Sequence, residues 1–353
     1  MIVNLFIVIM EIVGIIEGIK YKKVINKELK KFNINDNFNI NIASGSFIIN
    51  VNDNNFAVSK WVSPKRTRSY PYERVYDTFD FKNKIAVIPV IKDEGLDGDR
   101  DFLQWDTICL MNLLDIYIIF AYYDNAEKNN SYDNKITNQC FDNDFIIAKI
   151  KEISLYHSSA LHWNTQELNN INYVIEKIKN SYNKIQNNIG VKLKSHSGIQ
   201  AYLDKINISL DTFKKFSRTK AIMAQNREMQ TLQPKEKLEN LTKSKITIQN
   251  FQGGLYYFTV DEIEYDQKTN TFFLIESKCS KGGGLPISDI KDGLIKMILY
   301  TNITKIYLNN RIYNFRPVLK IFTNCQIEDD NFIKDLYLEA ECNNFIIDLK
   351  KYD

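Results

Sequence analysis

The first 120 residues alternate between short apolar runs and polar turns. "GSFIINV" (45–51) and "NFAVSKWV" (55–62) have the composition of strands, and the polar stretch between them is typical of a turn. "KIAVIPVI" (84–91) is apolar throughout, which predicts a strand buried on both faces. "FLQWDTICLMNLLDI" (102–116) has helical spacing, and "YIIFAYY" (117–123) predicts a further buried strand.

Helical patterns with polar faces follow from about residue 165 to 245, and strand patterns return after them. An amphipathic helix is predicted over 286–302, with Ser288 as its N-cap. Its apolar face consists of Ile290, Leu294, Met297 and Ile298. The order of elements predicts an α/β (α+β) protein with a mixed β-sheet flanked by helices.

Three regions follow from this order. Residues 1–165 form an N-terminal α/β region, residues 166–245 a helical region, and residues 246–353 a strand-rich region. No internal repeat and no long linker separates them. A chain of 353 residues can bury one large core or two modest ones.

Composition narrows the class of protein without assigning a function. With 44% hydrophobic and 25% charged residues, the chain has the composition of a soluble globular protein. A net charge of +3 permits a nucleic-acid partner but does not by itself indicate one. Its five cysteines are scattered with no metal-ligand spacing, so we expect reduced thiols and a cytoplasmic location.

The N-terminus is apolar, as a membrane segment or a signal peptide would be. Asn4, Glu11 and Glu17 interrupt it, and no basic residue precedes it. We therefore predict a buried strand or helix there, with Met1 and Met10 both open as the first residue of the protein.

The segment "FTVDEIEYDQKTNTFFLIESK" (258–278) concentrates charge at the ends of two predicted strands. If Asp266 faces Thr271 across the polar turn, antiparallel pairing places Asp261 opposite Glu276. Paired residues share a face and lie about 5 Å apart at Cβ. Alternation adds Lys278 to that face.

These three side chains suit metal-dependent hydrolysis of a phosphate ester. Two carboxylates at such a distance repel each other unless a divalent cation lies between them, and Mg²⁺ takes one or two protein carboxylates while keeping several waters. The backbone carbonyl of Ser277 is a further predicted ligand, and the ammonium of Lys278 can stabilise charge on the phosphate. The alternative is the solvated, charged rim of an ordinary hairpin.

Asp261, the following "IESK" (275–278), the amphipathic helix and the strand after it resemble the PD-(D/E)xK nuclease superfamily. "KWVSPKRTRSYPYERVYD", "IKDEGLDGDRDFLQWD" and "LQPKEKLENL" also resemble stretches of type II restriction endonucleases. The resemblance implies a restriction-endonuclease-like core in 246–353, with Asp261, Glu276 and Ser277 holding Mg²⁺ and Lys278 activating water. No proline precedes Asp261, unlike the name-giving motif, and Glu228 or Glu236 stays open as a further helix acid.

A basic, aromatic segment near residue 65 is the predicted DNA contact, in the part of the chain (1–165) assigned to DNA recognition. Basic side chains with interleaved rings suit phosphate tracking and base stacking, and the alternative is a solvated loop. The residues concerned are Lys65, Arg66, Arg68, Tyr70 and Arg74.

The resemblance implies a type II restriction endonuclease that hydrolyses double-stranded DNA at a short sequence with Mg²⁺-activated water. It also implies a homodimer and a cognate DNA methyltransferase as functional partner. A nuclease of DNA repair or recombination on the same core, and a non-cleaving DNA-binding protein, are the alternatives. The sequence leaves open the recognised bases, the cut position, the overhang and the oligomeric state.

Overall fold

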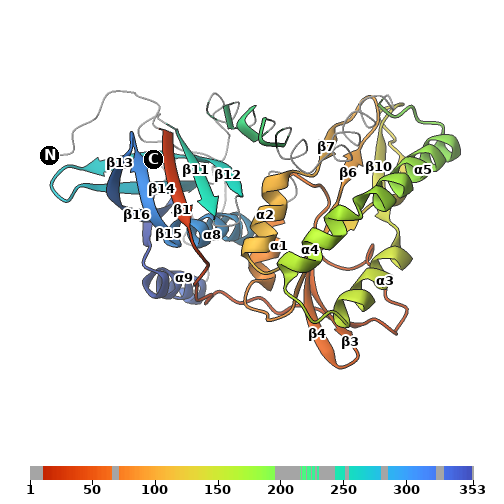
Figure 1. The fold of residues 1–353 in the computed structure, drawn as a ribbon, viewed down its shortest axis with the longest axis horizontal. Helices are drawn as coiled ribbons and strands as arrows, with labels where there is room; N and C mark the ends of the chain where they lie inside the picture. The colour runs from red at the N-terminus through yellow and green to blue at the C-terminus, as the bar shows by residue number, and fades with distance from the viewer. Residues whose placement is uncertain are drawn as a thin grey trace. The chain divides into compact units, whose positions relative to one another are not determined.

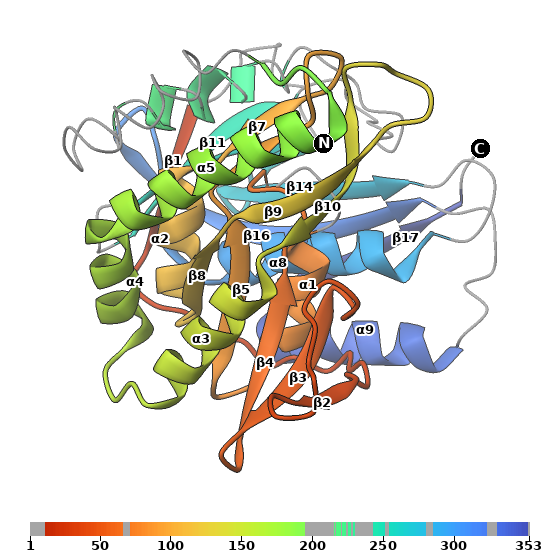
Figure 2. The ribbon, with the colours of Figure 1, turned by 90° about the vertical axis from the view of Figure 1, so that its right-hand side faces the viewer.

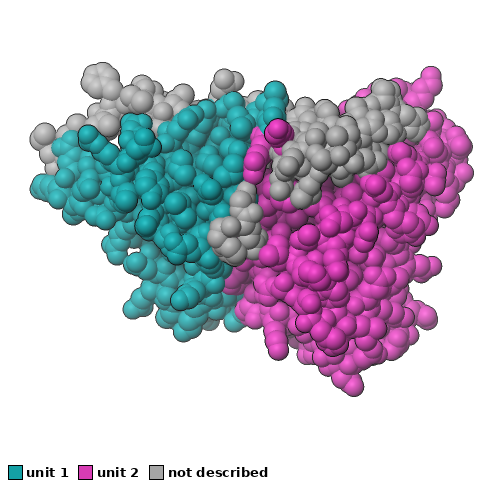
Figure 3. Space-filling view, in the orientation of Figure 1, with its two compact units in different colours: residues 1–27, 219–353 teal, residues 28–218 magenta. Residues whose placement is uncertain are grey.

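The computed structural model describes residues 11–65, 71–194, 243–250, 254–279, 285–322 and 330–351, with single positions between 215 and 229. The chain divides into two compact units, coloured separately in Figure 3. Unit 1 consists of residues 1–27 and 219–353, and unit 2 of residues 28–218. The sequence predicted three consecutive regions (1–165, 166–245 and 246–353), distinguished by their types of element. Unit 1 instead combines residues from both ends of the chain.

Unit 1 contains a mixed sheet of eight strands (Figure 1). Its elements are β1 (Glu11–Ile16), β11 (Ser244–Asn250), β12 (Leu255–Val260), β13 (Glu262–Asp266), β14 (Thr271–Cys279), α8 (Ile287–Thr301), β15 (Ile303–Leu308), β16 (Arg311–Phe322), α9 (Asp330–Asn343) and β17 (Ile346–Lys350). The strand order is β12-β11-β1-β15-β16-β14-β13, and β17 pairs with β16.

The N-terminal strand β1 completes this sheet. It pairs in parallel with β11 and antiparallel with β15, so it lies between strands more than 200 residues away in the chain. The buried Glu339 of α9 accepts hydrogen bonds from the backbone N–H groups of Val24 and Ile25 and from the Tyr21 hydroxyl. Of the buried strand or helix predicted at the N-terminus, the structure shows a strand at 11–16, and residues 1–10, with Met1 and Met10, lie outside the described residues.

The two edge strands of the sheet follow each other in the chain, with a single residue between them. β12 and β13 occupy opposite ends of the strand order, yet only Asp261 separates them. β12 also contacts β14 directly. The sheet therefore curls until its two ends approach each other, and Asp261 lies at that junction.

Unit 2 is built on a five-stranded sheet in the order β2-β3-β4-β5-β8 (Figure 2). Its elements are β2 (Lys31–Asn33), β3 (Ser46–Val51), β4 (Asn54–Lys60), α1 (Pro71–Thr78), β5 (Lys84–Pro89), β6 (Ile91–Asp93), β7 (Arg100–Phe102), α2 (Trp105–Leu113), β8 (Tyr117–Ala121), β9 (Tyr123–Lys128), β10 (Ile136–Phe141), α3 (Asn143–Ser154), α4 (Ala160–Asn169) and α5 (Ile171–Ile189). β6 pairs with β7, and β9 with β10.

The apolar runs read from the sequence form the core of unit 2. β3 and β4 form the predicted hairpin, whose turn places Asn52 and Asp53 in the left-handed region. β5 is buried on both faces, with Ile85 and Val87 in a cluster that includes Trp163 of α4. The expected mixed sheet flanked by helices is confirmed. None of the helices in the described part of the chain is both long and apolar enough to cross a membrane.

Candidate active site

The turn between β13 and β14 sets the register of the charged hairpin. The Asp266 carboxylate accepts hydrogen bonds from the Lys268 N–H at 2.9 Å and the Thr269 hydroxyl at 2.8 Å. Asn270 adopts a left-handed conformation with φ of 51°, which asparagine tolerates better than most residues. Asp266 then pairs with Thr271, and Glu262 with Ile275, as the sequence predicted.

The ladder ends at Glu262, one residue short of the predicted Asp261–Glu276 pair. Asp261 lies in the bend between β12 and β13, where its side chain turns back to β14 and accepts the Ser277 N–H at 2.8 Å. Asp261 and Glu276 are both almost fully buried, at 2% and 1% exposed. The predicted convergence is therefore present, but Asp261 reaches it by a side-chain hydrogen bond instead of the strand ladder.

Two lysines hold the Glu276 carboxylate. Lys278 Nζ lies 2.9 Å from one oxygen and Lys296 Nζ 2.7 Å from the other. Lys278 is also 3.2 Å from a carboxylate oxygen of Asp292. Lys296 and Asp292 belong to α8, so this helix contributes two of the five charged groups of the cluster. We call Asp261, Glu276, Lys278, Asp292 and Lys296 the acidic cluster.

The two buried carboxylates of the acidic cluster have opposite electrostatic environments. Burial and the charge of Glu276 raise the pKa of Asp261 well above its usual value, although Lys296, Lys278 and the Ser277 N–H oppose the shift. Burial acts in the same sense on Glu276, but Lys278 and Lys296 outweigh it and lower its pKa to about 2. Asp261 is thus a buried carboxylate with too little positive charge beside it.

The opposite face of the same hairpin carries a separate set of charges. Lys320 of β16 pairs in register with Ser277 and lies 3.2 Å from Glu262 and 3.8 Å from Glu264. Glu262 and Lys320 are 1% and 2% exposed. We call Glu262, Glu264 and Lys320 the Lys320 cluster; its position agrees with the prediction that both glutamates point away from Asp261.

Helix α8 packs closely over the face that carries the acidic cluster. A Cβ atom added to Gly293 would lie 2.9 Å from Leu319 Cδ1 and 3.2 Å from Lys278 Cε. The predicted apolar face of this helix is buried, as expected. Ser288, however, is not the N-cap: the helix begins at Ile287 after Pro286, and Pro286 accepts the N–H of Asp289, which leaves Ser288 within the first turn.

Asp261, Glu276 and Ser277 supply the type of ligand that Mg²⁺ prefers. Both carboxylates are hard oxygen donors, and burial together with the charge of Glu276 raises the pKa of Asp261. The N–H and C=O of a strand residue point the same way, so the Ser277 carbonyl lies on the edge that Asp261 contacts. Among the described residues no group of three or more His, Cys, Asp or Glu side chains could hold a metal ion, so a site here would have to draw on two carboxylates and a carbonyl.

Of the predicted DNA-contacting residues, the structure describes two. Lys65 forms an ion pair with Asp101. Arg74 of α1 donates to the Lys60 carbonyl at 2.7 Å, and burial lowers the pKa of its guanidinium. Arg66, Arg68 and Tyr70, together with the candidate helix acids Glu228 and Glu236, lie outside the described residues.

Sequence reasoning missed Asp292 and Lys296. They are four residues apart on a helix that was itself predicted, so they share one side of it. The charged residues of α8, the helix that follows the strand with Glu276 and Lys278, could have been predicted to lie near these two side chains. No family model, curated protein or solved structure matches the chain.

Proposed function

We propose that the chain is a Mg²⁺-dependent type II restriction endonuclease with a restriction-endonuclease-like core in unit 1. The observation that carries the proposal is the joint burial of Asp261 and Glu276 beside Lys278 on one face of the β14 region. Burying two carboxylates together is costly unless a cation compensates them. A cation bound beside Asp261 and Glu276 would compensate both charges.

In this proposal Asp261, Glu276 and Ser277 serve the metal, while Lys278 and Asp292 serve the phosphate. Asp261, Glu276 and the Ser277 carbonyl would hold Mg²⁺, which when bound would supply charge neutralisation and a more acidic attacking water. Lys278 presents its ammonium beside Glu276 and stabilises charge on the phosphate as water adds and the bond to the sugar oxygen breaks. Asp292 positions the Lys278 ammonium from α8.

The proposed substrate is double-stranded DNA with a short specific sequence. A two-fold site favours a homodimer, and a cognate DNA methyltransferase is the expected functional partner. The proposed location is the cytoplasm, where such an enzyme would meet DNA.

The test is digestion of supercoiled plasmid DNA by the full chain with Mg²⁺ and with EDTA. We expect discrete fragments with Mg²⁺ only, and sequencing of the ends gives the recognised bases. Asp261→Ala abolishes cleavage, while Glu264→Gln, a change to the half-buried acid of the opposite face, leaves it intact. Absence of Mg²⁺-dependent cleavage by the wild type contradicts the nuclease proposal, and full activity of Asp261→Ala contradicts the site.

A further inference from the structure

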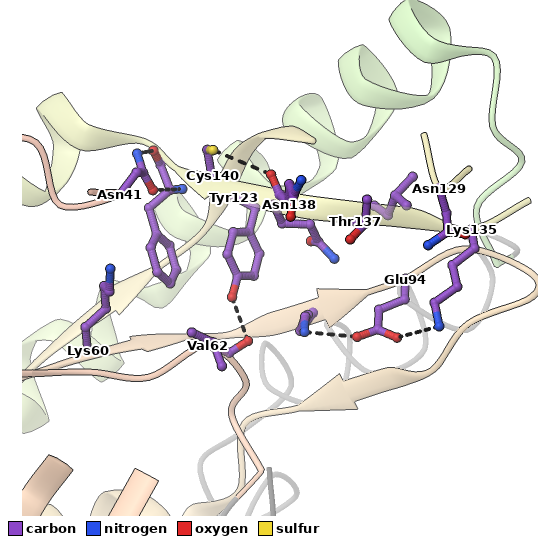
Figure 4. Close-up of a pocket in the computed structure, with 14 residues that line it drawn as sticks. Asn41, Lys60, Val62, Glu94, Tyr123, Asn129, Lys135, Thr137, Asn138 and Cys140 are labelled. Atoms are coloured by element: carbon purple, nitrogen blue, oxygen red, sulfur yellow. Dashed lines mark hydrogen bonds and ion pairs between the residues drawn. The ribbon is translucent and has the colours of Figure 1, made fainter. Parts of the chain in front are cut away.

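A cavity of about 530 Å³ is lined by residues between Asn41 and Phe141, all of which belong to unit 2. The residues of the acidic cluster belong to unit 1. The volume of the cavity falls within the usual range for small-molecule sites, about 300–1,000 Å³. It is lined by the end of β4, the segment after β6, and the β9–β10 ribbon (Figure 4). Its lining residues are far more polar than those of the apolar core beside them.

The charge of the lining is positive. Among the described residues, three lysines (Lys60, Lys92 and Lys135) and one acid, Glu94, line the cavity, an excess of two positive charges. The Lys60 ammonium donates to the backbone carbonyls of Ile40 and Ala43. Glu94 lies 2.9 Å from Lys92 and 3.9 Å from Lys135. Burial, and after it the charge of Arg74, lower the pKa of Lys60 to about 8. An anion in the cavity would offset this excess.

The lining also contains polar side chains at a distortion of β10. The ladder between β9 and β10 skips Asn138 and Gln139, and Asn138 adopts a left-handed conformation with φ of 48°. Bulges of this kind re-aim side chains and occur often beside functional sites. Thr137 and Asn138 border the cavity in Figure 4, next to the distorted part of the strand.

Aromatic rings form another part of the lining. Tyr123 and Phe141 are stacked, with ring centroids 4.4 Å apart and planes inclined by 15°. The Tyr123 hydroxyl donates to the Val62 carbonyl at 2.8 Å, which fixes the orientation of the ring. Flat, rigid rings beside amide groups suit a planar ligand with polar edges.

From these features we propose that the cavity of unit 2 binds one nucleotide. The phosphate interacts with the lysines beside Glu94, of which Figure 4 labels Lys135. The base lies against the rings of Tyr123 and Phe141 and against the amide side chains of β10. A nucleotide combines a planar group with hydrogen-bonding edges and an anion, which are the three properties that the lining complements. The nucleotide comes either from solution or from a nucleic-acid strand, and the site is independent of cleavage in unit 1.

Alkylation of cysteines in the wild-type full chain tests this directly. Cys140 lines the cavity and is half-buried, whereas the exposed Cys342 belongs to unit 1 and serves as internal control. Each of the four deoxynucleoside monophosphates is added in turn before iodoacetamide, and modification of each cysteine is followed by mass spectrometry. We expect at least one of them to slow modification of Cys140 and not of Cys342.

Two matched variants locate the bound ligand. Lys135→Ala weakens binding about tenfold, the effect of losing one charge-assisted hydrogen bond. Lys128→Ala removes an exposed lysine of the same ribbon, which pairs with Asp133 and does not line the cavity, and leaves the affinity unchanged. Calorimetry measures both affinities, and a thermal melt confirms that each variant is folded.

The outcomes separate the sources of the ligand from failure of the proposal. Protection by free nucleotides alone indicates a soluble nucleotide, and protection by mixed-sequence oligonucleotides as well indicates a nucleotide within a strand. Equal protection by inorganic phosphate, equal binding by Lys135→Ala, or no protection by any of these probes overturns the proposal. All measurements are made in EDTA, so absence of DNA cleavage does not affect them.

Discussion

The two faces of the β13–β14 hairpin both bury charge, but they balance it differently. In the Lys320 cluster one fully buried acid, Glu262, meets one fully buried lysine at 3.2 Å. In the acidic cluster two fully buried acids lie together, and both lysines approach Glu276 while Asp261 receives a backbone N–H. Glu276 belongs to the acidic cluster, and its neighbour in the strand, Ser277, donates its hydroxyl to Glu262 of the Lys320 cluster at 3.4 Å.

Because both faces bury charge, the burial of charge does not by itself indicate a functional site. A matched buried ion pair contributes little net stability, but removing one partner is costly. A second carboxylate in the same site raises the energy of the folded chain, so it needs a compensating ligand or a function. The imbalance around Asp261, and not the number of ion pairs, is what distinguishes the acidic cluster.

The largest expected effects come from exchanging one lysine of each cluster for methionine. Lys278→Met reduces cleavage by at least about 100-fold, because the charge beside the phosphate is lost. Its stability changes little, because Lys296 still pairs with Glu276. Lys320→Met leaves Glu262 buried without that charge and costs about 3–5 kcal/mol in the free energy of unfolding.

Plasmid cleavage and urea denaturation of both variants check this pair of predictions. Cleavage is measured at a temperature where Lys320→Met is still folded, and there this variant is expected to cleave like the wild type. If Lys278→Met lost stability while Lys320→Met lost activity, the assignment of the two faces would be reversed.

Asp261→Asn probes the imbalance itself. The amide oxygen can still accept the Ser277 N–H, and the repulsion with Glu276 is gone, so metal-free stability stays equal or rises. Mg²⁺ at about 100 times its dissociation constant stabilises the wild type by about 2.7 kcal/mol, and this gain is absent in the variant. Thermal melts with and without Mg²⁺ measure both effects, and an unchanged gain in Asp261→Asn would place the metal elsewhere.

Gly293→Ala tests, with a smaller expected effect, whether the packing of α8 positions Lys278. The added methyl group presses on Leu319 and Lys278, so cleavage falls roughly tenfold through displacement of the ammonium. Replacing a helical glycine offsets the crowding by about 1 kcal/mol, which keeps stability near that of the wild type. Gly18→Ala is the control, because nothing lies within 4 Å of its added methyl. Cleavage rates and melting temperatures decide, and full activity of Gly293→Ala would contradict the positioning of Lys278 by this contact.

The smallest expected effect is in the pH dependence of stability in EDTA. A raised folded pKa at Asp261 means that the folded chain holds the extra proton, so its contribution to stability falls as pH rises above 3.8. Glu276, lowered from 4.5 to about 2, contributes stability that is present above 4.5 and lost as pH falls through that range. Urea midpoints from pH 3 to 7 therefore shift in opposite directions, relative to the wild type, for Asp261→Asn and Glu276→Gln. Shifts in the same direction would contradict the two environments.

Local sequence predicted the hairpin, since the turn residues between Asp266 and Thr271 determine its register and alternation then separates Glu276 from Ser277. The apolar faces of β5 and α8 were predictable for the same reason. The position of β1 between β11 and β15 was not, because no local pattern encodes pairing across more than 200 residues. Lys296 was missed because its contact with Glu276 depends on how α8 packs over the sheet.

Diffraction from crystals of the full chain grown with Mn²⁺, recorded at the manganese absorption edge, tests the central claim most directly. The account predicts an anomalous peak in contact with carboxylate oxygens of both Asp261 and Glu276, and none beside Glu262 and Glu264. Mn²⁺ at the Lys320 cluster, or a fully occupied peak elsewhere with none at Asp261, would contradict it.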